Sequence, residues 1–220
     1  MNRSGATDTA RSFIEPDMFT PSRNVAWPFG RLVPRAYSLI FIDPPWHFIT
    51  RSKRGESKSP QAKYRTMTID DIAALPVADL AADDCLLWMW ATAPMVDRQM
   101  EILKGWGFDF SSSGVWVKTT VNGRLGFGTG YTFRNCHEII LLGTRGSPEI
   151  KSKSVRSVIM AQAREHSRKP DEAYAAARAM IPYGRAADVF SRERRPTWEG
   201  FGDEFGKFDT ANDGGMNVAV

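Results

Sequence analysis

The sequence predicts an α/β protein with a doubly wound sheet, because short apolar runs alternate along it with helical segments. The clearest run, residues 39–42 (LIFI), is too short for a helix and apolar throughout, as in a strand buried on both faces of a parallel sheet. It leads directly into Asp43, Pro44, Pro45 and Trp46. Ligands of such sheets bind beyond the carboxyl ends of the strands, so a site is expected here. The alternative is that the prolines end the strand and the Trp covers the core.

The other elements follow in order along the chain. The stretch TIDDIAAL predicts a short helix, because Thr68 and Asp71 have the spacing of a capping box. CLLWMW is a predicted strand, and Pro94 is expected to begin a helix that ends near Gly105. GVWVK and EIILLG are two further strands. Pro170 begins an alanine-rich helix with acids in its first turn, and AADVF is the last predicted strand.

The 220 residues suffice for one domain with a sizeable core, which we expect over residues 23–208. The polar segment 1–22 is expected to be disordered and the tail 209–220 flexible. No apolar run has the length of a membrane span, and the start of the chain lacks the apolar core of a signal peptide. Cys85 and Cys136 are expected to be free thiols, and no Cys/His cluster has zinc spacing. These features predict a cytoplasmic protein without a metal site.

The basic residues are concentrated directly after Trp46. The net charge of +4 permits an anionic partner without requiring one. Between residues 51 and 65, however, the acid Glu56 is outnumbered by six basic side chains. We predict that part of this stretch contacts nucleic-acid phosphates, and the alternative is a solvated loop. The residues proposed for phosphate contact are Arg51, Lys53, Arg54 and Lys58.

The residues at 43–46 suit a reaction at an exocyclic amine of a flat heteroaromatic ring, whose lone pair is delocalised. If the Asp43 carboxylate and the Pro44 carbonyl accept the two N–H bonds, the nitrogen is drawn towards tetrahedral geometry and becomes nucleophilic. The prolines restrict the backbone and hold that carbonyl in one direction. Trp46 offers a face for stacking, worth roughly 1–3 kcal/mol for a nucleobase. The candidate catalytic residues are Asp43, Pro44, Pro45 and Trp46.

The DPPW motif is followed in order by YRTMTIDDI, LWMWAT, GVWVK and EHSRKPDE. This series resembles the amino-methyltransferases that use S-adenosylmethionine, and in particular the family of the eukaryotic messenger-RNA adenosine methyltransferase with its bacterial and phage members. The resemblance covers residues 24–206 and is greatest to the compact bacterial and phage type. It implies a Rossmann-like methyltransferase sheet in which the catalytic motif precedes the main cofactor-binding segment. The sequence agrees, because no glycine-rich strand–turn–helix precedes Asp43.

The resemblance also implies a set of cofactor contacts. It assigns Lys169, in SRKP, to the methionine carboxylate, and places Asp203 and Glu204 where relatives carry amides that bind the ribose hydroxyls. His166 precedes Lys169, and a surface position is the alternative for it. Relatives place an acid near the cofactor's adenine, whereas NVAWPFG has none, so backbone groups would serve. The predicted cofactor-binding residues are Asp43, His166, Lys169, Asp188, Arg192, Asp203 and Glu204.

Substrate contacts are implied in the same way. Tyr64 matches a pocket tyrosine, and Glu138 matches an acid that faces the active site, with a structural cap as the alternative. The glycine-rich segment 119–135 lacks the ending of a phosphate loop. In the family it lies near the substrate and the protomer interface, which implies a homodimer or a heterodimer with a related subunit. The predicted substrate-binding residues are Arg51, Lys53, Arg54, Lys58, Tyr64, Lys118, Arg134 and Glu138.

The sequence therefore predicts an S-adenosylmethionine-dependent methyltransferase acting on the N(6) amino group of adenine in nucleic acid, with DNA preferred over RNA. Duplex DNA would require base flipping. One alternative is a non-catalytic nucleic-acid-binding partner of a catalytic sister protein, although the intact residues 43–46 disfavour it. Another is an amino-methyltransferase acting on RNA or on a protein amide.

Overall fold

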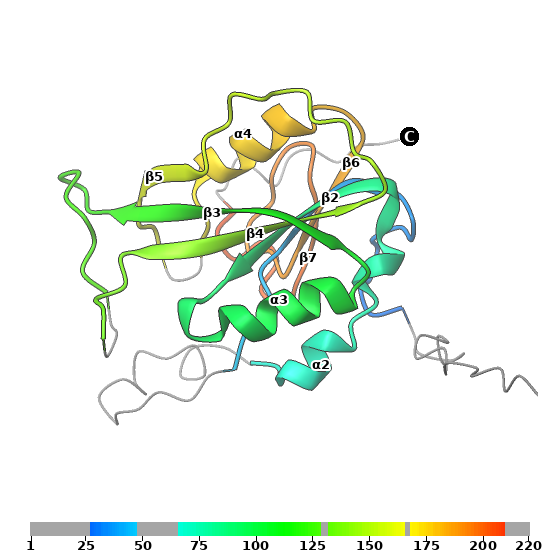
Figure 1. Cartoon of the computed structure of the whole chain (residues 1–220), viewed down its shortest axis with the longest axis horizontal. Helices are drawn as coiled ribbons and strands as arrows, with labels where there is room; N and C mark the ends of the chain where they lie inside the picture. The colour runs from blue at the N-terminus through cyan, green and yellow to red at the C-terminus, as the bar shows by residue number, and fades with distance from the viewer. Residues whose placement is uncertain (1–26, 48–65, 129–131, 166–167, 210–220) are drawn as a thin grey trace, which may run out of the picture.

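A seven-stranded sheet in the order β5-β3-β4-β2-β1-β6-β7 forms the centre of the molecule (Figure 1). The computed structural model describes residues 27–47, 66–128, 132–165 and 168–209. The predicted disordered segment 1–22 and, apart from Asp209, the predicted tail lie outside these ranges. The strands are β1 (Tyr37–Ile42), β2 (Ala81–Ala91), β3 (Asp109–Thr119), β4 (His137–Arg145), β5 (Val158–Gln162), β6 (Arg185–Val189) and β7 (Glu199–Phe201).

The sheet is mixed, with β4 running opposite to the other strands. β1 pairs in parallel with β2 and β6, β6 with β7, and β3 with β5. β4 lies between β2 and β3 and is antiparallel to both. The predicted α/β class is confirmed, but β3 and β4 follow each other as an antiparallel pair and not as parallel strands joined by a helix. This reversal brings the start of β4 to the edge of the sheet where its neighbours end.

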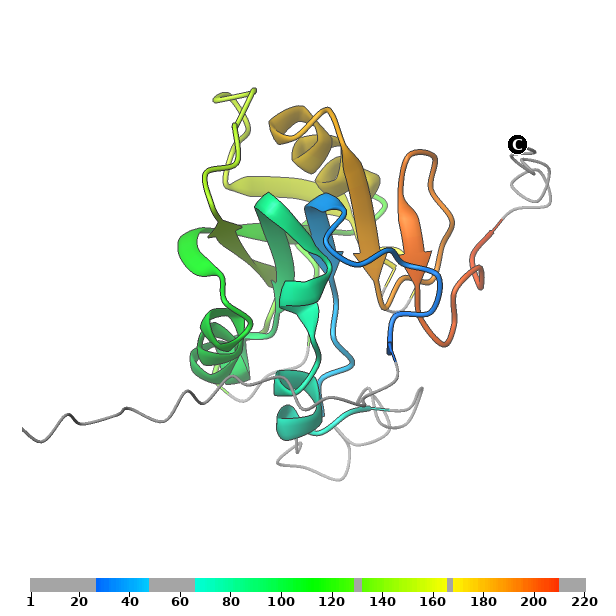
Figure 2. The ribbon, with the colours of Figure 1, turned by 90° about the vertical axis from the view of Figure 1, so that its right-hand side faces the viewer.

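Helices cover both faces of the sheet (Figures 1 and 2). α2 (Ile69–Ala73) and α3 (Val96–Gly105) lie on one face, and α4 (Asp171–Met180) lies on the other. Short 3₁₀ turns occur at η2 (Val77–Asp79) and η3 (Ala93–Met95). Alternate residues of β1 supply the two faces: Ile40 and Ile42 belong to one buried cluster, and Leu39 and Phe41 to the other. The prediction of a strand buried on both faces is therefore confirmed.

The helix boundaries agree with the predicted end signals. Thr68 is the N-cap of α2, and its side-chain oxygen accepts a hydrogen bond from the Asp71 amide at 3.1 Å. Pro94 lies in η3, directly before α3, which ends at Gly105 as predicted. Pro170 precedes the first residue of α4.

Two strands were absent from the prediction. In β5, Ile159 and Ala161 are buried while Val158 and Met160 are largely exposed, so apolar residues on both faces hide the alternation in the sequence. β7 has only three residues and shows no pattern. Within the described ranges, no helix is long and apolar enough to span a membrane, and no group of His, Cys, Asp and Glu side chains could hold a metal ion.

Candidate active site

The carboxyl edge of the sheet brings together side chains from three distant segments. Asp43 follows the last residue of β1, and its backbone amide donates to the Val189 carbonyl of β6 at 3.2 Å. Glu138 is the second residue of β4, and the reversed direction of that strand places it at the same edge. Lys169 lies in the segment between β5 and α4. These three residues meet although they are far apart in the sequence.

Lys169 lies between the two carboxylates. Its Nζ atom is 3.0 Å from Asp43 Oδ2 and 2.8 Å from Glu138 Oε2. Its side chain is only 8% exposed, and the ammonium group lies 4.9 Å from the centre of the Trp90 ring. On the other side, Lys118 Nζ is 2.6 Å from Glu138 Oε1. Positive and negative groups thus alternate along a partly buried row from Asp43 to Lys118, and we call these residues the charge row.

The charged groups of the row shift the pKa values of Asp43, Glu138 and Lys169. Burial raises the pKa of Asp43 above its ordinary value, and the Lys169 ammonium opposes this rise. Burial also acts to raise the pKa of Glu138, but Lys169 and Lys118 outweigh it and lower that pKa to about 2. Burial acts to lower the pKa of Lys169, and the two carboxylates raise it above its ordinary value. Lys169 is therefore the cation on which both acids depend.

The backbone of residues 43–46 forms a tight, bonded turn. The Pro44 carbonyl accepts the Trp46 amide at 2.8 Å, and the Pro45 carbonyl accepts the Met67 amide at 3.0 Å. The Trp46 side chain is 4% exposed and its indole N–H donates to the Trp90 carbonyl at 3.3 Å. The structure thus places Trp46 in the core beneath the motif, where it packs. Stacking of a base on its ring stays a prediction.

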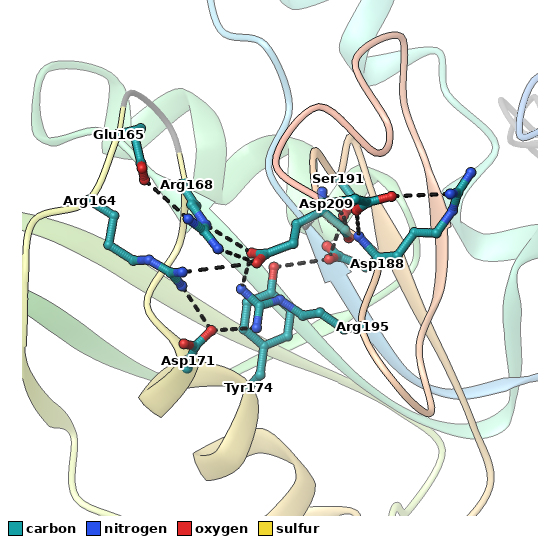
Figure 3. A network of polar contacts seen from close by, with 11 residues as sticks. Arg164, Glu165, Arg168, Asp171, Tyr174, Asp188, Ser191, Arg195 and Asp209 are labelled. Atoms are coloured by element: carbon teal, nitrogen blue, oxygen red, sulfur yellow. Dashed lines mark hydrogen bonds and ion pairs between the residues drawn. The ribbon is translucent and has the colours of Figure 1, made fainter. Parts of the chain in front are cut away.

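A pocket lies beside the charge row, at the carboxyl end of β6. Its lining includes Asp43, Lys169, Tyr174, Asp188 and Ser191. The Asp188 carboxylate accepts hydrogen bonds from the Tyr174 hydroxyl at 2.9 Å and the Ser191 hydroxyl at 2.8 Å (Figure 3). Burial raises the pKa of Asp188 to about 6. The sequence prediction identified Asp188 but missed Tyr174, whose only signal is that it is the large side chain in an alanine-rich helix.

The remaining cofactor candidates lie on the segments after β6 and β7. Arg192 lines the same pocket, and its Nε atom is 3.0 Å from Glu204 Oε2. Glu204 also pairs with Lys207. Asp203 is exposed in the turn after β7. The structure thus pairs Glu204 with Arg192, a residue of the pocket lining, and a ribose contact by Asp203 or Glu204 stays a prediction.

Other predicted residues do not gather at the pocket. Arg134 is exposed in the loop between β3 and β4, with its guanidinium 5.6 Å from the centre of the Phe127 ring. It is not among the residues that line the pocket. Six predicted residues lie outside the part of the chain that the structure describes: Arg51, Lys53, Arg54, Lys58, Tyr64 and His166.

The sequence is similar to known methyltransferases of several organisms. A profile of the MT-A70 family matches residues 37–204. The chain is 29% identical over 182 residues to the Arabidopsis thaliana N(6)-adenosine-methyltransferase MT-A70-like, covering 81% of this chain and 25% of the relative. It is 28% identical over 173 residues to the human N(6)-adenosine-methyltransferase catalytic subunit METTL3, covering 76% and 28%. It is 25% identical over 194 residues to the type II methyltransferase M.MunI of a Mycoplasma species, covering 80% and 81%.

The chain thus spans about a quarter of the length of these plant and human relatives and four-fifths of the Mycoplasma one. The matched residues run from the first residue of β1 to Glu204. They contain the whole charge row and all the lining of the pocket. On this match, the chain belongs to the MT-A70 family.

Proposed function

We propose that this chain is an S-adenosylmethionine-dependent methyltransferase that acts on the N(6) amino group of adenine in nucleic acid. The observation that carries the proposal is the position of Asp43, which stands at the strand end beside a pocket and is paired with the buried Lys169. Relatives named as N(6)-adenosine-methyltransferases support the reaction. We further propose that the protein acts in the cytoplasm.

In this proposal Asp43 and Pro44 hold the target amine. The Asp43 carboxylate accepts one N–H of the adenine amino group and the Pro44 carbonyl accepts the other. That carbonyl already accepts the Trp46 amide, so it keeps one lone pair in a fixed direction. Lys169 favours the ionised form of Asp43, in which both carboxylate oxygens only accept. The amine becomes acidic once it carries the methyl group, so these residues need to position it more than to act as a strong base.

The donor set at the pocket fits S-adenosylmethionine, which supplies the methyl group when bound. Asp43 and Asp188 can accept from ammonium and hydroxyl groups, and Arg192 can donate to a carboxylate. Lys169 has three N–H donors, of which two point to Asp43 and Glu138, so one remains for the methionine carboxylate assigned to it above. Glu204, paired with Arg192, and the neighbouring Asp203 are the residues proposed for the ribose.

We propose DNA as the preferred substrate. The Mycoplasma relative is matched over 81% of its length and is named a type II methyltransferase. The plant and human N(6)-adenosine-methyltransferases are matched over only about a quarter of their length, so most of each lies outside the match. We also propose assembly into a homodimer or a heterodimer with a related subunit. The loop between β3 and β4 supports this, because it exposes Val121, Leu125, Phe127 and Phe133 at 61–83% of their surface.

Mass-spectrometric nucleoside analysis of DNA and RNA from cells that express the protein tests this proposal. N(6)-methyladenine should accumulate in DNA with the wild-type chain and not with Asp43→Ala. If N(6)-methyladenine accumulated in RNA alone, the proposed preference for DNA would be wrong. If only protein amides were methylated, the proposed nucleic-acid substrate would be wrong. If no methyl group is transferred and calorimetry detects no binding of S-adenosylmethionine, the non-catalytic alternative is the better account.

A further inference from the structure

Figure 3 shows a network of arginines and carboxylates. It lies next to the charge row, because Arg168 directly precedes Lys169 and both line the same pocket. Its centre is Glu193, in the segment between β6 and β7. Glu193 pairs with Arg168 through two nitrogen atoms, one of them at 3.1 Å, and with Arg195 at 2.5 Å. A third arginine, Arg164, lies 3.9 Å from the same carboxylate. Three guanidinium groups from two segments thus converge on one side chain.

The network fixes the segment that carries Lys169. Arg168 is the residue directly before Lys169, and Glu193 holds it from the β6–β7 segment. Two residues after Lys169, Asp171 begins α4 and pairs with Arg195 at 2.5 Å. Arg195 also binds Glu193. Lys169 therefore lies between two anchor points that both lead to the same short segment, 193–195.

The burial of the two Glu193 pairs, with Arg168 and Arg195, distinguishes them from ordinary surface ion pairs. The side chains of Glu193, Arg168 and Arg195 are 15%, 16% and 13% exposed. Exposed pairs contribute little, whereas buried charge-assisted bonds to a guanidinium fix geometry. The Arg195 guanidinium also lies 3.9 Å from the centre of the Tyr174 ring, and the Tyr174 hydroxyl donates to Asp188. Arg168, Glu193 and Arg195 thus form one side of the pocket, next to Tyr174 and Asp188.

We propose that Glu193 is a positioning residue, which keeps Lys169 between Asp43 and Glu138 by holding Arg168 and Arg195. This inference rests on the proposed function of Asp43. Glu193 does not touch Asp43; it acts through the two arginines and the backbone between them. Without its carboxylate, the segment from Arg168 to Asp171 loses its common anchor, and the Lys169 ammonium withdraws from Asp43.

The sign of one pKa change separates this role from a direct electrostatic effect. The charged groups that interact with Asp43 are Lys169, Glu138, Arg192 and Asp188. Removing a nearby negative charge would by itself lower the pKa of Asp43. Withdrawal of Lys169 would raise it, because this ammonium favours the ionised carboxylate. A rise after the loss of a negative charge can therefore come only from displaced geometry.

The experiment is an NMR titration of the Asp43 carboxyl group in the full-length wild type and in Glu193→Gln. The matched control is Glu199→Gln, because Glu199 also pairs with an arginine, Arg185, through two bonds of 2.8 and 2.6 Å. That pair lies at the amino end of β6, at the opposite edge of the sheet. We expect the Asp43 pKa to rise in Glu193→Gln and to stay unchanged in Glu199→Gln. An unchanged or lowered Asp43 pKa in Glu193→Gln overturns the proposal.

A second variant covers the case in which Glu193→Gln does not fold. Glu193→Asp keeps the charge but is one methylene shorter, so it cannot reach the arginines of both segments in the same geometry. The same two outcomes apply to its titration: a raised Asp43 pKa supports the proposal, and an unchanged or lowered one overturns it.

Measurement of kcat and KM for methyl transfer is an independent test of the proposal. We expect kcat for methyl transfer to fall on the order of tenfold to a hundredfold in Glu193→Gln, with KM for the nucleic acid unchanged, because misplacement of a positioned group costs this much. Glu199→Gln should keep wild-type kcat. An unchanged kcat in Glu193→Gln counts against the proposal. A wild-type chain that transfers no methyl group would overturn the proposed function instead, while the titration still decides whether Glu193 positions Lys169.

Discussion

At the scale of single residues, Lys169 is the buried cation that pairs with both carboxylates of the site. A lysine in the polar stretch SRKP is usually solvated, but this one is 8% exposed and lies between Asp43 and Glu138. Separately, each of these charges would be costly to bury, and an unpaired one would change its protonation state. Together they satisfy one another. We therefore treat the acid and its cation as one functional unit.

Asp43→Ala should abolish methyl transfer while the protein stays folded. Lys169 keeps Glu138 as its partner in this variant, so no buried charge is left unpaired. The carboxylate is engaged most strongly as the target nitrogen becomes tetrahedral, so the loss falls on kcat more than on cofactor binding. Single-turnover assays, with calorimetry of S-adenosylhomocysteine binding, measure both quantities. The control is Asp83→Ala, an exposed acid paired with Arg35, and wild-type turnover in Asp43→Ala would remove Asp43 from the mechanism.

At the scale of elements, the direction of β4 and the end of β1 build the site. The reversed β4 brings Glu138 to the edge where β1 and β6 end. The end of β1 is held in place by the turn through Pro44 and by Trp46, which packs beneath it and binds the Trp90 carbonyl of β2. The motif is thus supported from the neighbouring strand. Removal of the Trp46 side chain should therefore lower the free energy of unfolding by a measurable amount.

Trp46→Ala should lower the free energy of unfolding by about 3–5 kcal/mol, as expected for truncation of a buried aromatic side chain. Trp46→Phe retains most of the apolar surface and loses one hydrogen bond, so we expect a loss of about 1–2 kcal/mol. Urea unfolding of both variants measures these values.

Trp106 offers a matched control, because it is equally buried and its indole N–H donates to the Ile72 carbonyl at 3.2 Å, beneath α2. Trp106→Ala should lose similar stability and keep turnover, whereas Trp46→Ala should also lose turnover. If Trp46→Ala were as stable as the wild type, the packing role would be wrong. If Trp46→Phe retained nucleic-acid affinity that Trp46→Ala lost, a stacking face would be needed as well.

At the scale of the whole molecule, the fold buries ionisable side chains at the carboxyl edge of the sheet, and this burial shifts their pKa values. Asp188 shows this most clearly, because burial raises its pKa to about 6 even though two hydroxyl groups donate to it. The folded chain then binds a proton at Asp188 more tightly than the unfolded chain does. The stability of the molecule and the state of its pocket are linked through pH.

Asp188→Asn tests this linkage. For the wild type, this group makes the free energy of unfolding fall as the pH rises from about 4 to about 6, by on the order of 3 kcal/mol from the difference in pKa. The variant cannot ionise at this position and should lack that decrease. Urea unfolding at pH 4 and pH 7 gives the change in the free energy of unfolding for each protein. The contributions of the titratable groups that the two proteins share cancel when one change is subtracted from the other. Glu199→Gln is a control in which the pH dependence changes in the opposite direction. The Arg185 guanidinium lowers the pKa of Glu199, so this group makes the free energy of unfolding rise as the pH rises. Equal pH dependence in wild type and Asp188→Asn would contradict the assignment.

The basic stretch after Trp46 carries the last prediction, which rests on the sequence alone. If Arg51, Lys53, Arg54 and Lys58 contact phosphates, changing all four to Ser should reduce the slope of log affinity against log salt by roughly 2–4 units. A salt titration on one oligonucleotide measures this slope. A control with the same change in net charge replaces four basic residues elsewhere. If the plots of log affinity against log salt for the wild type and for the first variant were parallel, phosphate contact by the stretch would be excluded. The control residues are Arg35, Arg98, Lys104 and Lys151.

The sequence by itself determined the features that depend on neighbouring residues. The double burial of β1, the cap at Thr68, the proline before α4 and the position of Asp43 after a strand all follow from patterns within a few residues. The resemblance to a methyltransferase family added Glu138 and Lys169 as site residues. Such patterns are readable because steric preference and hydrogen bonding act locally.

Only the tertiary structure decided which charges meet. Nothing in SRKP shows that Lys169 lies between Asp43 and Glu138, and nothing in SRERR shows that Glu193 gathers three arginines, because exposed and buried charged residues look alike in a sequence. These contacts depend on the order of the strands and on the reversal of β4, which are set by packing across the whole sheet. The pairing of buried charges therefore depends on the whole fold. Each charge loses its hydration on burial and is stabilised only by an oppositely charged partner that the fold places beside it.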